Sequence, residues 1–229
     1  MTYTKAIGLG CKRILDRIVA SLALARIDPN LLTALGLGIN VIAAVLFGYG
    51  KFWQAGVVVI CAGIFDMVDG RVARATNTVS RFGAFFDSVV DRYSDLALYF
   101  GLLVYYARIN RFFYVVLVAV VMTGSVMVSY SRARAESMIP SCKVGFMERP
   151  ERIVLVIIGA LFARMAAVLW VIAVLSNVTV IHRILYTYRA TREPAAVRAA
   201  RAARASEGLD PPLEAKPAAM AGGVPPARA

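Results

Sequence analysis

Six apolar stretches divide this chain, and they limit its possible folds more than any other feature of the sequence. They cover residues 31–49, 53–73, 84–106, 112–132, 153–163 and 165–186. A helix needs about 20 mainly apolar residues to cross a membrane, and a chain with 59% hydrophobic and 17% charged residues is too apolar for an ordinary soluble domain. The sequence therefore predicts an all-α integral membrane protein, a bundle of six transmembrane helices. The fifth stretch is short, so its helix has to begin near Glu151 in order to cross.

The basic residues give this bundle a direction. Of the 26 Lys and Arg residues, 21 fall at the two ends of the chain and in the connections around 71–82 and 132–152. Positive charge accumulates on the cytoplasmic side of membrane proteins. We therefore expect a multi-pass protein of the cell (inner) membrane, with both termini and the loops 74–83 and 133–152 in the cytoplasm.

The two ends of the chain differ from its apolar centre. Residues 4–26 can place apolar side chains on one helical face and basic side chains on the other. This predicts an N-terminal amphipathic helix that lies either in the membrane interface or against the protein's own cytoplasmic face. Residues 1–190 form the expected membrane domain, and residues 191–229, which are rich in Ala, Pro and Arg, form an expected disordered cytoplasmic tail.

Four carboxylates lie inside the apolar stretches, where charge is costly: Asp66, Asp69, Asp87 and Asp91. Their spacings of three and four residues place each pair on one helical face, and the expected topology brings both pairs to a similar membrane depth. Two antiparallel helices can then point four carboxylates into one small volume. Hard oxygen ligands without histidine or cysteine suit Mg²⁺ or Mn²⁺, with Ca²⁺ as a further option. Four carboxylates are enough for two ions, so the sequence predicts a site for two divalent cations.

Asp95 continues the same spacing one helical turn deeper. A carboxylate at that depth requires a counter-charge. We expect Asp95 to be the buried partner of a positive group such as Arg92, with contact to the metal as the less favoured alternative.

Residues around the aspartates fit a phosphate ligand. Gly70 and Gly83 lack side chains where a ligand can approach the backbone closely. Arg74 offers a guanidinium fork to phosphate oxygens, and Ser80 and Thr78 offer hydroxyl groups. Two simpler interpretations stay open: Gly83 merely starts a helix, and Arg74 merely anchors the cytoplasmic end of one.

These residues together resemble a known motif. The pattern Asp66-x2-Asp69-Gly70-x2-Ala73-Arg74-x8-Gly83-x3-Asp87-x3-Asp91 matches all eight fixed positions of the CDP-alcohol phosphotransferase motif, which is typical of a family of membrane enzymes. The resemblance extends over most of residues 25–188 and includes the segment "DPNLLT" before the first apolar stretch.

The resemblance implies an activity and a set of roles. The family transfers a phosphoalcohol group from a CDP-linked lipid to a second alcohol, and CMP leaves. By resemblance, the four motif aspartates hold two divalent ions and Asp91 is also the general base. The residues that match the family's CDP-lipid site are Asn30, Thr33, Gly70, Arg74, Ser80 and Gly83. For Asn30 and Thr33 a simpler role, at the start of a helix, stays open.

The second substrate has to be inferred from the basic loop after the fourth stretch. Its segments "SYSRARAE" and "ERPER" are similar to those of the bacterial phosphatidylinositol phosphate synthases, whose acceptor is an inositol phosphate. By this resemblance, the residues expected to bind the acceptor phosphate are Arg132, Lys143, Arg149 and Arg152. A simpler interpretation stays open, in which these are charges of the cytoplasmic side that are partly paired with Glu136, Glu148 and Glu151. Arg132 stands where those synthases usually have lysine, which leaves room for another phosphorylated polyol.

The resulting prediction is a membrane transferase that uses CDP-diacylglycerol, inositol phosphate and Mg²⁺ or Mn²⁺. Like its relatives, it is expected to be a homodimer in membrane lipid, and no nucleic-acid partner is indicated. Two alternatives stay open: the same chemistry with glycerol 3-phosphate as acceptor, which is that of phosphatidylglycerophosphate synthase, and a divalent-cation carrier whose transport site is the aspartate cluster.

Overall fold

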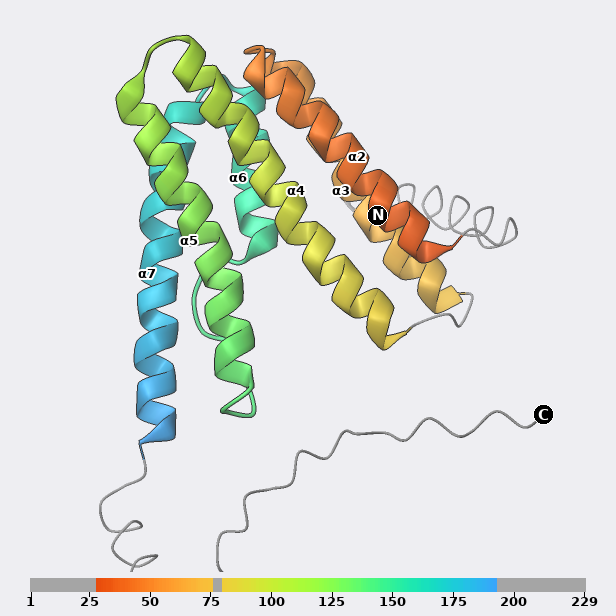
Figure 1. Ribbon diagram of the computed structural model, residues 1–229, viewed down its shortest axis with the longest axis vertical. Helices are drawn as coiled ribbons and strands as arrows, with labels where there is room; N and C mark the ends of the chain where they lie inside the picture. The colour runs from red at the N-terminus through yellow and green to blue at the C-terminus, as the bar shows by residue number, and fades with distance from the viewer. Residues whose placement is uncertain (1–27, 76–79, 193–229) are drawn as a thin grey trace, which may run out of the picture.

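The chain forms a bundle of six helices in the computed structural model, which describes residues 28–75 and 80–192 (Figure 1). In chain order they are α2 (Pro29–Gly48), α3 (Phe52–Ala75), α4 (Arg81–Arg108), α5 (Phe112–Glu136), α6 (Arg149–Leu161) and α7 (Met165–Thr191). No strand occurs in these described ranges. Each helix coincides with one of the six apolar stretches, so the prediction of an all-helical fold is confirmed. The predicted N-terminal amphipathic helix and nearly all of the predicted tail lie outside the described residues.

Of the six described helices, three are long and apolar enough to cross a membrane: Asn30–Gly48, Phe112–Glu136 and Met165–Thr191. In α3 the apolar part is the shorter segment Phe52–Val68, and α4 carries three carboxylates, Asp87, Asp91 and Asp95. The 13 residues of α6 rise only about 20 Å, which is less than the roughly 30 Å of a hydrocarbon core. For α3, α4 and α6 a membrane span therefore stays a prediction.

Local signals in the sequence determine where α2 and α4 begin. Asp28 caps α2, because its carboxylate accepts a hydrogen bond of 2.8 Å from the Asn30 N–H. Ser80 caps α4 in the same way, since its Oγ accepts a hydrogen bond of 2.9 Å from the Gly83 N–H. The cap at Ser80 fixes the point from which α4 carries its aspartates into the bundle.

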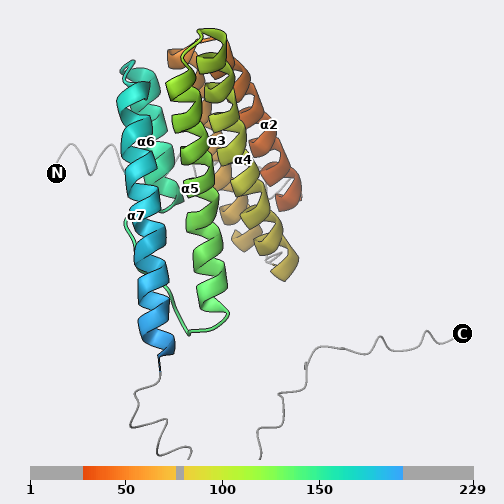
Figure 2. The same ribbon diagram turned by 60° about the vertical axis from the view of Figure 1, so that its left-hand side comes forward.

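α6 is a short helix that reverses into α7. It begins at Arg149, close to the position near Glu151 that the sequence required, and Pro150 occupies its first turn, where no backbone N–H is needed. The chain turns back after Leu161 through Ala163, which has a φ of 53°. The reversal is tight, so α6 lies against α7 (Figure 2).

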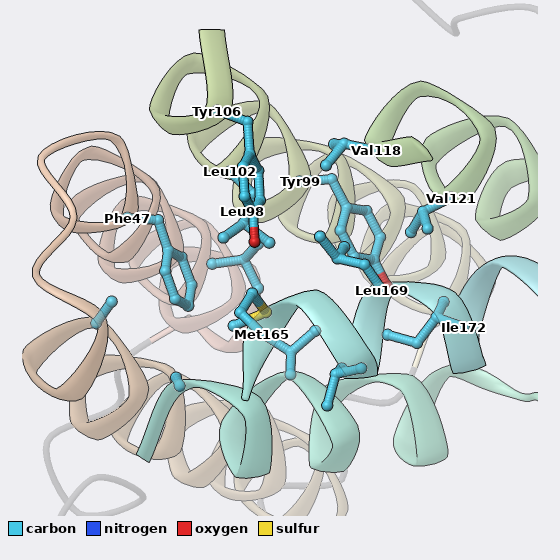
Figure 3. Close-up of a cluster of buried hydrophobic side chains, with 14 of the residues drawn as sticks. Phe47, Leu98, Tyr99, Leu102, Tyr106, Val118, Val121, Met165, Leu169 and Ile172 are labelled. Carbon is cyan, nitrogen blue, oxygen red and sulfur yellow. The ribbon is translucent and has the colours of Figure 1, made fainter. Parts of the chain in front are cut away.

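The helices pack in two groups, one of α2, α3 and α4 and one of α5, α6 and α7, which are joined by contacts of α4 with α5 and of α3 with α6. α2 contacts both α3 and α4, while α5 contacts α4 and α7, and α6 contacts α3 and α7. Buried side chains from several helices fill the interior (Figure 3): Phe47, Leu98, Tyr99, Leu102, Val118, Val121, Leu169 and Ile172. The main chains of α2 and α4 approach each other at Gly101, where an added Cβ would lie 2.1 Å from the Ala44 carbonyl oxygen. Small residues allow this kind of close helix approach in membrane proteins.

We expect Gly101→Val to lower the free energy of unfolding by about 2–3 kcal/mol, because its side chain would overlap the main chain of α2. Thermal unfolding of the detergent-purified protein measures this change. Gly38→Ala in α2 is the matched control, since nothing lies within 4 Å of its added Cβ. An unchanged unfolding temperature for Gly101→Val would contradict the close approach of α2 and α4.

Candidate active site

An arginine from α6 joins carboxylates from α3 and α4. The Arg149 guanidinium lies 2.9 Å from Asp66 Oδ2 through Nη2 and 2.9 Å from Asp91 Oδ1 through Nη1. Its Nε lies 3.4 Å from Asp95 Oδ1. The structure therefore brings Asp66 and Asp91, which are 25 positions apart in the sequence, to the same positive group.

Asp95 is the buried end of this cluster. Its side chain is 4% exposed, and its Oδ2 lies 2.7 Å from Nη2 of Arg152, whose side chain is 1% exposed. Ser125 in α5 donates a further hydrogen bond of 3.3 Å to the same oxygen. The cluster around Asp95 therefore ties α4 to α5 and α6 inside the bundle.

The expectation that Asp95 is buried against a positive group is met, but the suggested partner Arg92 is wrong. Arg92 lies on the same helix and donates hydrogen bonds to the backbone carbonyl and hydroxyl of Ser88, one turn earlier. The partners of Asp95 are Arg152 and Arg149, which come from α6. Helical spacing along α4 carries no information about them, since they lie more than 50 residues further along the chain.

A cavity of about 500 Å³ lies beside these ion pairs, with walls from α4, α5, α6, α7 and the end of the loop before α6. Among the described residues, five arginines and five carboxylates line it: Arg92, Arg132, Arg149, Arg152, Arg183, Asp87, Asp91, Asp95, Glu136 and Glu148. The cavity is therefore strongly charged, and the formal charges of these ten residues balance. Its carboxylates can bind the metal ion on one phosphate group, and its arginines can bind a second, free phosphate group.

Glu148 and Arg183 also line this cavity. The sequence predicted Glu148 only as a partner of the basic loop and predicted no role for Arg183 in the site. Glu148 Oε1 lies 2.9 Å from Arg132 Nη1 and 3.2 Å from Arg183 Nη2. Arg183 has a side chain only 1% exposed, and its Nε donates a hydrogen bond of 2.8 Å to the Val144 carbonyl. In the sequence Arg183 looks like the first charge of the basic tail. Its position within an apolar helix was the signal that could have identified it.

The loop before α6 is held against α7 by close contacts. Gly145 has a φ of 104°, and a Cβ added to it would lie 2.3 Å from Thr179 Cγ2. The Met147 N–H donates a hydrogen bond of 3.2 Å to Thr179 Oγ1. These contacts position the chain just before Arg149, so they help to set where that side chain enters the cavity.

The residues expected to bind the CDP-lipid lie near the beginnings of α2 and α4 and in the last turns of α3. A Cβ at Gly83 would lie 3.1 Å from Ser80 Oγ and 3.5 Å from Asn30 Oδ1, so these three residues are neighbours. The simpler interpretation of Gly83 as part of a helix start is confirmed by its hydrogen bond to Ser80. Thr33 is buried in α2, and Arg74 is exposed at the end of α3.

Three of the predicted positions lie outside what the structure describes in detail. Asp69 and Gly70 are part of α3, but the structure does not describe the contacts or the burial of these two residues. Thr78 falls in the range 76–79, which is also outside the described residues. Their predicted roles therefore stay predictions.

The residues expected to bind the acceptor phosphate separate into two groups. Arg132, Arg149 and Arg152 all line the cavity. Lys143 is exposed and is not part of the cavity lining. The structure thus gathers three of the four predicted residues and places the fourth elsewhere in the loop.

The carboxylates fit a divalent cation, although the described residues contain no group of three or more acidic, histidine or cysteine side chains arranged to hold one. Asp66 and Asp91 each place one oxygen against the guanidinium of Arg149. Carboxylates from two helices thus already share one positive charge. They are hard oxygen donors of the kind that Mg²⁺ and Mn²⁺ prefer, so the donor set suits such an ion.

Comparison with known proteins identifies the family. A family model described as CDP-alcohol phosphatidyltransferase matches residues 26–187, which include all the described helices except the end of α7. The chain belongs to this family. It is therefore a CDP-alcohol phosphatidyltransferase, as the aspartate motif indicated, and the interpretation as a divalent-cation carrier is not retained.

Two curated relatives cover most of this phosphatidyltransferase. The archaetidylinositol phosphate synthase of Pyrococcus horikoshii is 37% identical over 174 residues, which are 76% of this chain and 90% of the relative. The phosphatidylinositol phosphate synthase of Mycobacteroides abscessus is 35% identical over 181 residues, which are 75% of this chain and 82% of the relative.

The fold of this phosphatidyltransferase is also similar to a solved structure. The phosphatidylinositol phosphate synthase PgsA1 of Mycobacterium tuberculosis with CDP-DAG bound has a TM-score of 0.74 and 32% identity, covering 80% of this chain and 99% of PgsA1. PgsA1 in complex with manganese and citrate has a TM-score of 0.72 and 31% identity, with 79% and 93% of the two chains covered.

We expect Asp95→Asn to lower the free energy of unfolding of this phosphatidyltransferase by about 3–5 kcal/mol, because it leaves the buried charge of Arg152 without its ionic partner. The double variant with Asp95→Leu and Arg152→Met should recover part of that loss. Thermal unfolding in detergent measures both changes.

Glu136→Gln is the control for the Asp95 variant. It removes a carboxylate from an ion pair with Arg132 whose side chains are 36% and 37% exposed. Such an exposed pair contributes at most about 1 kcal/mol. Equal losses of stability in Asp95→Asn and Glu136→Gln would show that the buried pair has no special structural role.

Proposed function

We propose that this enzyme transfers the phosphatidyl group of CDP-diacylglycerol to a hydroxyl of inositol phosphate, which yields phosphatidylinositol phosphate and CMP. One observation carries the proposal. The motif residues Asp87 and Asp91 line the same cavity as arginines from α5, α6 and α7. Groups suited to a metal-bound pyrophosphate and groups suited to a second phosphate thus face one space.

The names of the relatives support inositol phosphate as the acceptor. The two relatives are named as an archaetidylinositol phosphate synthase and a phosphatidylinositol phosphate synthase. Both names contain inositol phosphate, and they differ only in the word for the lipid. CDP-DAG is bound in the structure of PgsA1. We therefore take inositol phosphate and CDP-diacylglycerol as the substrate pair to be tested first.

The carboxylates provide the site for the activating ions in this proposal. Asp66, Asp69, Asp87 and Asp91 would hold two divalent cations, Mg²⁺ or Mn²⁺, and manganese is present in one PgsA1 structure. Such ions neutralise pyrophosphate oxygens and stabilise the departing CMP. The proposed CDP-lipid contacts are Asn30, Thr33, Gly70, Arg74, Ser80 and Gly83.

Asp91 is the general base in this mechanism. Its carboxylate lines the cavity, so an acceptor hydroxyl there can approach it. As the acceptor oxygen forms a bond to the β-phosphorus, its proton passes to the Asp91 carboxylate. The bond from the β-phosphorus to the bridging oxygen breaks, and CMP leaves with that electron pair.

The arginines of the opposite wall bind the acceptor phosphate. Arg132 suits this role because its ion pairs with Glu136 and Glu148 use only Nε and Nη1, and its side chain is 36% exposed. A guanidinium with an accessible edge can bind phosphate through two nitrogens. Arg183 holds Glu148 on the same wall. Arg149, Arg152 and Lys143 complete the proposed set, with Arg152 acting from a buried position.

The proposal includes the setting of the enzyme. All six helices cross the cell (inner) membrane, the cavity opens to the cytoplasm, and two copies form a homodimer. The distribution of Lys and Arg supports this orientation. Cytoplasmic access suits a water-soluble acceptor such as inositol phosphate.

The decisive experiment measures CMP release by the detergent-purified protein with CDP-diacylglycerol and Mg²⁺. Inositol phosphate, glycerol 3-phosphate, free inositol and serine are supplied in parallel, each with and without EDTA. Of the four acceptors, we expect only inositol phosphate to support CMP release, and we expect EDTA to abolish this release. Turnover with glycerol 3-phosphate instead would make the enzyme a phosphatidylglycerophosphate synthase, and turnover that survives EDTA would exclude the role of metal.

Asp91→Asn should reduce turnover by about 10²- to 10⁴-fold, the range expected for loss of a general base. Binding of CDP-diacylglycerol should remain measurable. Ser129→Ala, in the α5 wall of the same cavity, is the control and should keep normal turnover. Recovery of Asp91→Asn activity at high Mn²⁺ concentration would show that Asp91 serves only as a metal ligand.

A further inference from the structure

Arg149 occupies the position where a cation would be expected. Its three ion-pair contacts go to Asp66, Asp91 and Asp95, and two of these carboxylates belong to the metal-binding motif. One guanidinium therefore uses Nη1, Nη2 and Nε to satisfy three carboxylates from two helices. The ion pairs of Arg132, Arg152 and Arg183, in contrast, do not join α3 to α4.

The three contacts of Arg149 differ in accessibility. The side chains of Arg149, Asp66 and Asp91 are 27%, 24% and 22% exposed, so solutes can reach the two outer contacts. Asp95 is only 4% exposed and is held by Arg152. An ion that enters from solvent therefore meets Asp66 and Asp91 first, while the contact with Asp95 is protected.

A divalent cation and the guanidinium compete for the two outer carboxylates. Asp66 Oδ2 and Asp91 Oδ1 are each 2.9 Å from a guanidinium nitrogen, and two cations a few ångströms apart repel each other strongly in a partly buried site. Ion binding at Asp66 and Asp91 therefore weakens the contacts of these carboxylates with Nη1 and Nη2 of Arg149 and favours their release. Asp95 can keep Nε, so the displaced side chain stays tethered at the wall of the cavity.

We propose that Arg149 is an internal counter-ion of the motif carboxylates and that metal binding releases its Nη1 and Nη2 to bind the acceptor phosphate. The inference rests on the proposed function, because it assigns the released fork to the phosphate of the second substrate. Two parallel N–H groups match two phosphate oxygens, which a lysine in this position would not do. Asp95 is a positioning residue in this scheme, since it holds Arg149 through Nε.

The scheme requires the metal and the phosphate to help each other bind. A phosphate that engages Arg149 removes the competitor of the metal, and by linkage the metal must increase phosphate affinity by the same factor. The enzyme would then assemble its acceptor site only after the ions that activate the donor are in place. Such an order limits binding of the acceptor to an enzyme that is ready to react.

The test measures Mn²⁺ affinity of the full chain in detergent, by the electron paramagnetic resonance signal of free Mn²⁺. Sulfate is the probe for the phosphate group, because it is a tetrahedral dianion that leaves Mn²⁺ in solution, and chloride at equal ionic strength is its reference. We expect sulfate to lower the Mn²⁺ dissociation constant of the wild type about fivefold or more, the usual lower range of such coupling.

Arg149→Gln should bind Mn²⁺ about fivefold to tenfold more tightly than the wild type in chloride, since the competitor is gone, and sulfate should no longer change its affinity. Arg149→Lys keeps the charge without the fork and should show intermediate Mn²⁺ affinity with little response to sulfate. Arg134→Gln removes the same charge at an exposed site of α5 outside the cavity lining, and should behave like the wild type.

Unchanged or weaker Mn²⁺ binding in Arg149→Gln would overturn the inference, and so would equal tightening in Arg134→Gln, which would indicate a general charge effect. The assay requires no turnover. If all four acceptors fail in the CMP assay while the Mn²⁺ coupling is observed, the proposed function is wrong and the counter-ion role of Arg149 stands.

Discussion

The ion-pair cluster of Arg149, Arg152 and Asp95 is the constraint on which the arrangement of this site depends. It joins α6 to α4 through a pair of 2.7 Å whose side chains are almost completely buried, and α6 to α3 through Asp66. A buried charge without its partner is strongly destabilising, so the start of α6 cannot move away from the aspartates without a large loss of stability. The motif carboxylates of α3 and α4 and the basic wall of the cavity are thereby held in a fixed relation.

Charge balance explains how so polar a cavity can exist inside an apolar bundle. The described part of its lining contains equal numbers of arginines and carboxylates, and several of them are paired, as in the contacts of Glu148 with Arg132 and Arg183. Charged groups inside membrane proteins are tolerated when they pair with each other or face water. A substrate with phosphate groups and divalent cations adds both signs of charge, so it can exchange partners with these pairs without leaving one sign uncompensated. This property suits a reaction in which one phosphate is attacked and another only recognised.

The sequence predicted the six helices and the aspartate motif because both are local features. The apolar stretches set the positions of the helices. The first and last residues of the helices differ from those of the stretches by a few positions, where caps such as Asp28 and Ser80 or charged first turns extend the helices. The pairing of charges could not be predicted in the same way. Arg152 and Asp95 are 57 residues apart in the sequence, and Arg183 lies 35 residues from Glu148. Only the folded chain therefore shows which charged side chains form ion pairs. The prediction that Arg92 neutralises Asp95 was wrong for this reason, because the partner of Asp95 comes from α6 and not from its own helix.

The shortness of α6 gives the site its depth. A helix of 13 residues covers only about 20 Å, and its far end is fixed by the tight reversal at Ala163 into α7. Its first turn, which carries Arg149 and Arg152, therefore lies inside the bundle, level with Asp91 and Asp95 of α4. The preceding loop has to follow it inward, and the contacts of Gly145 and Met147 with Thr179 hold it there. A helix two turns longer would carry both arginines beyond the carboxylates. The length of α6 thus determines that the aspartates of α4 and the arginines of α6 meet in one cavity.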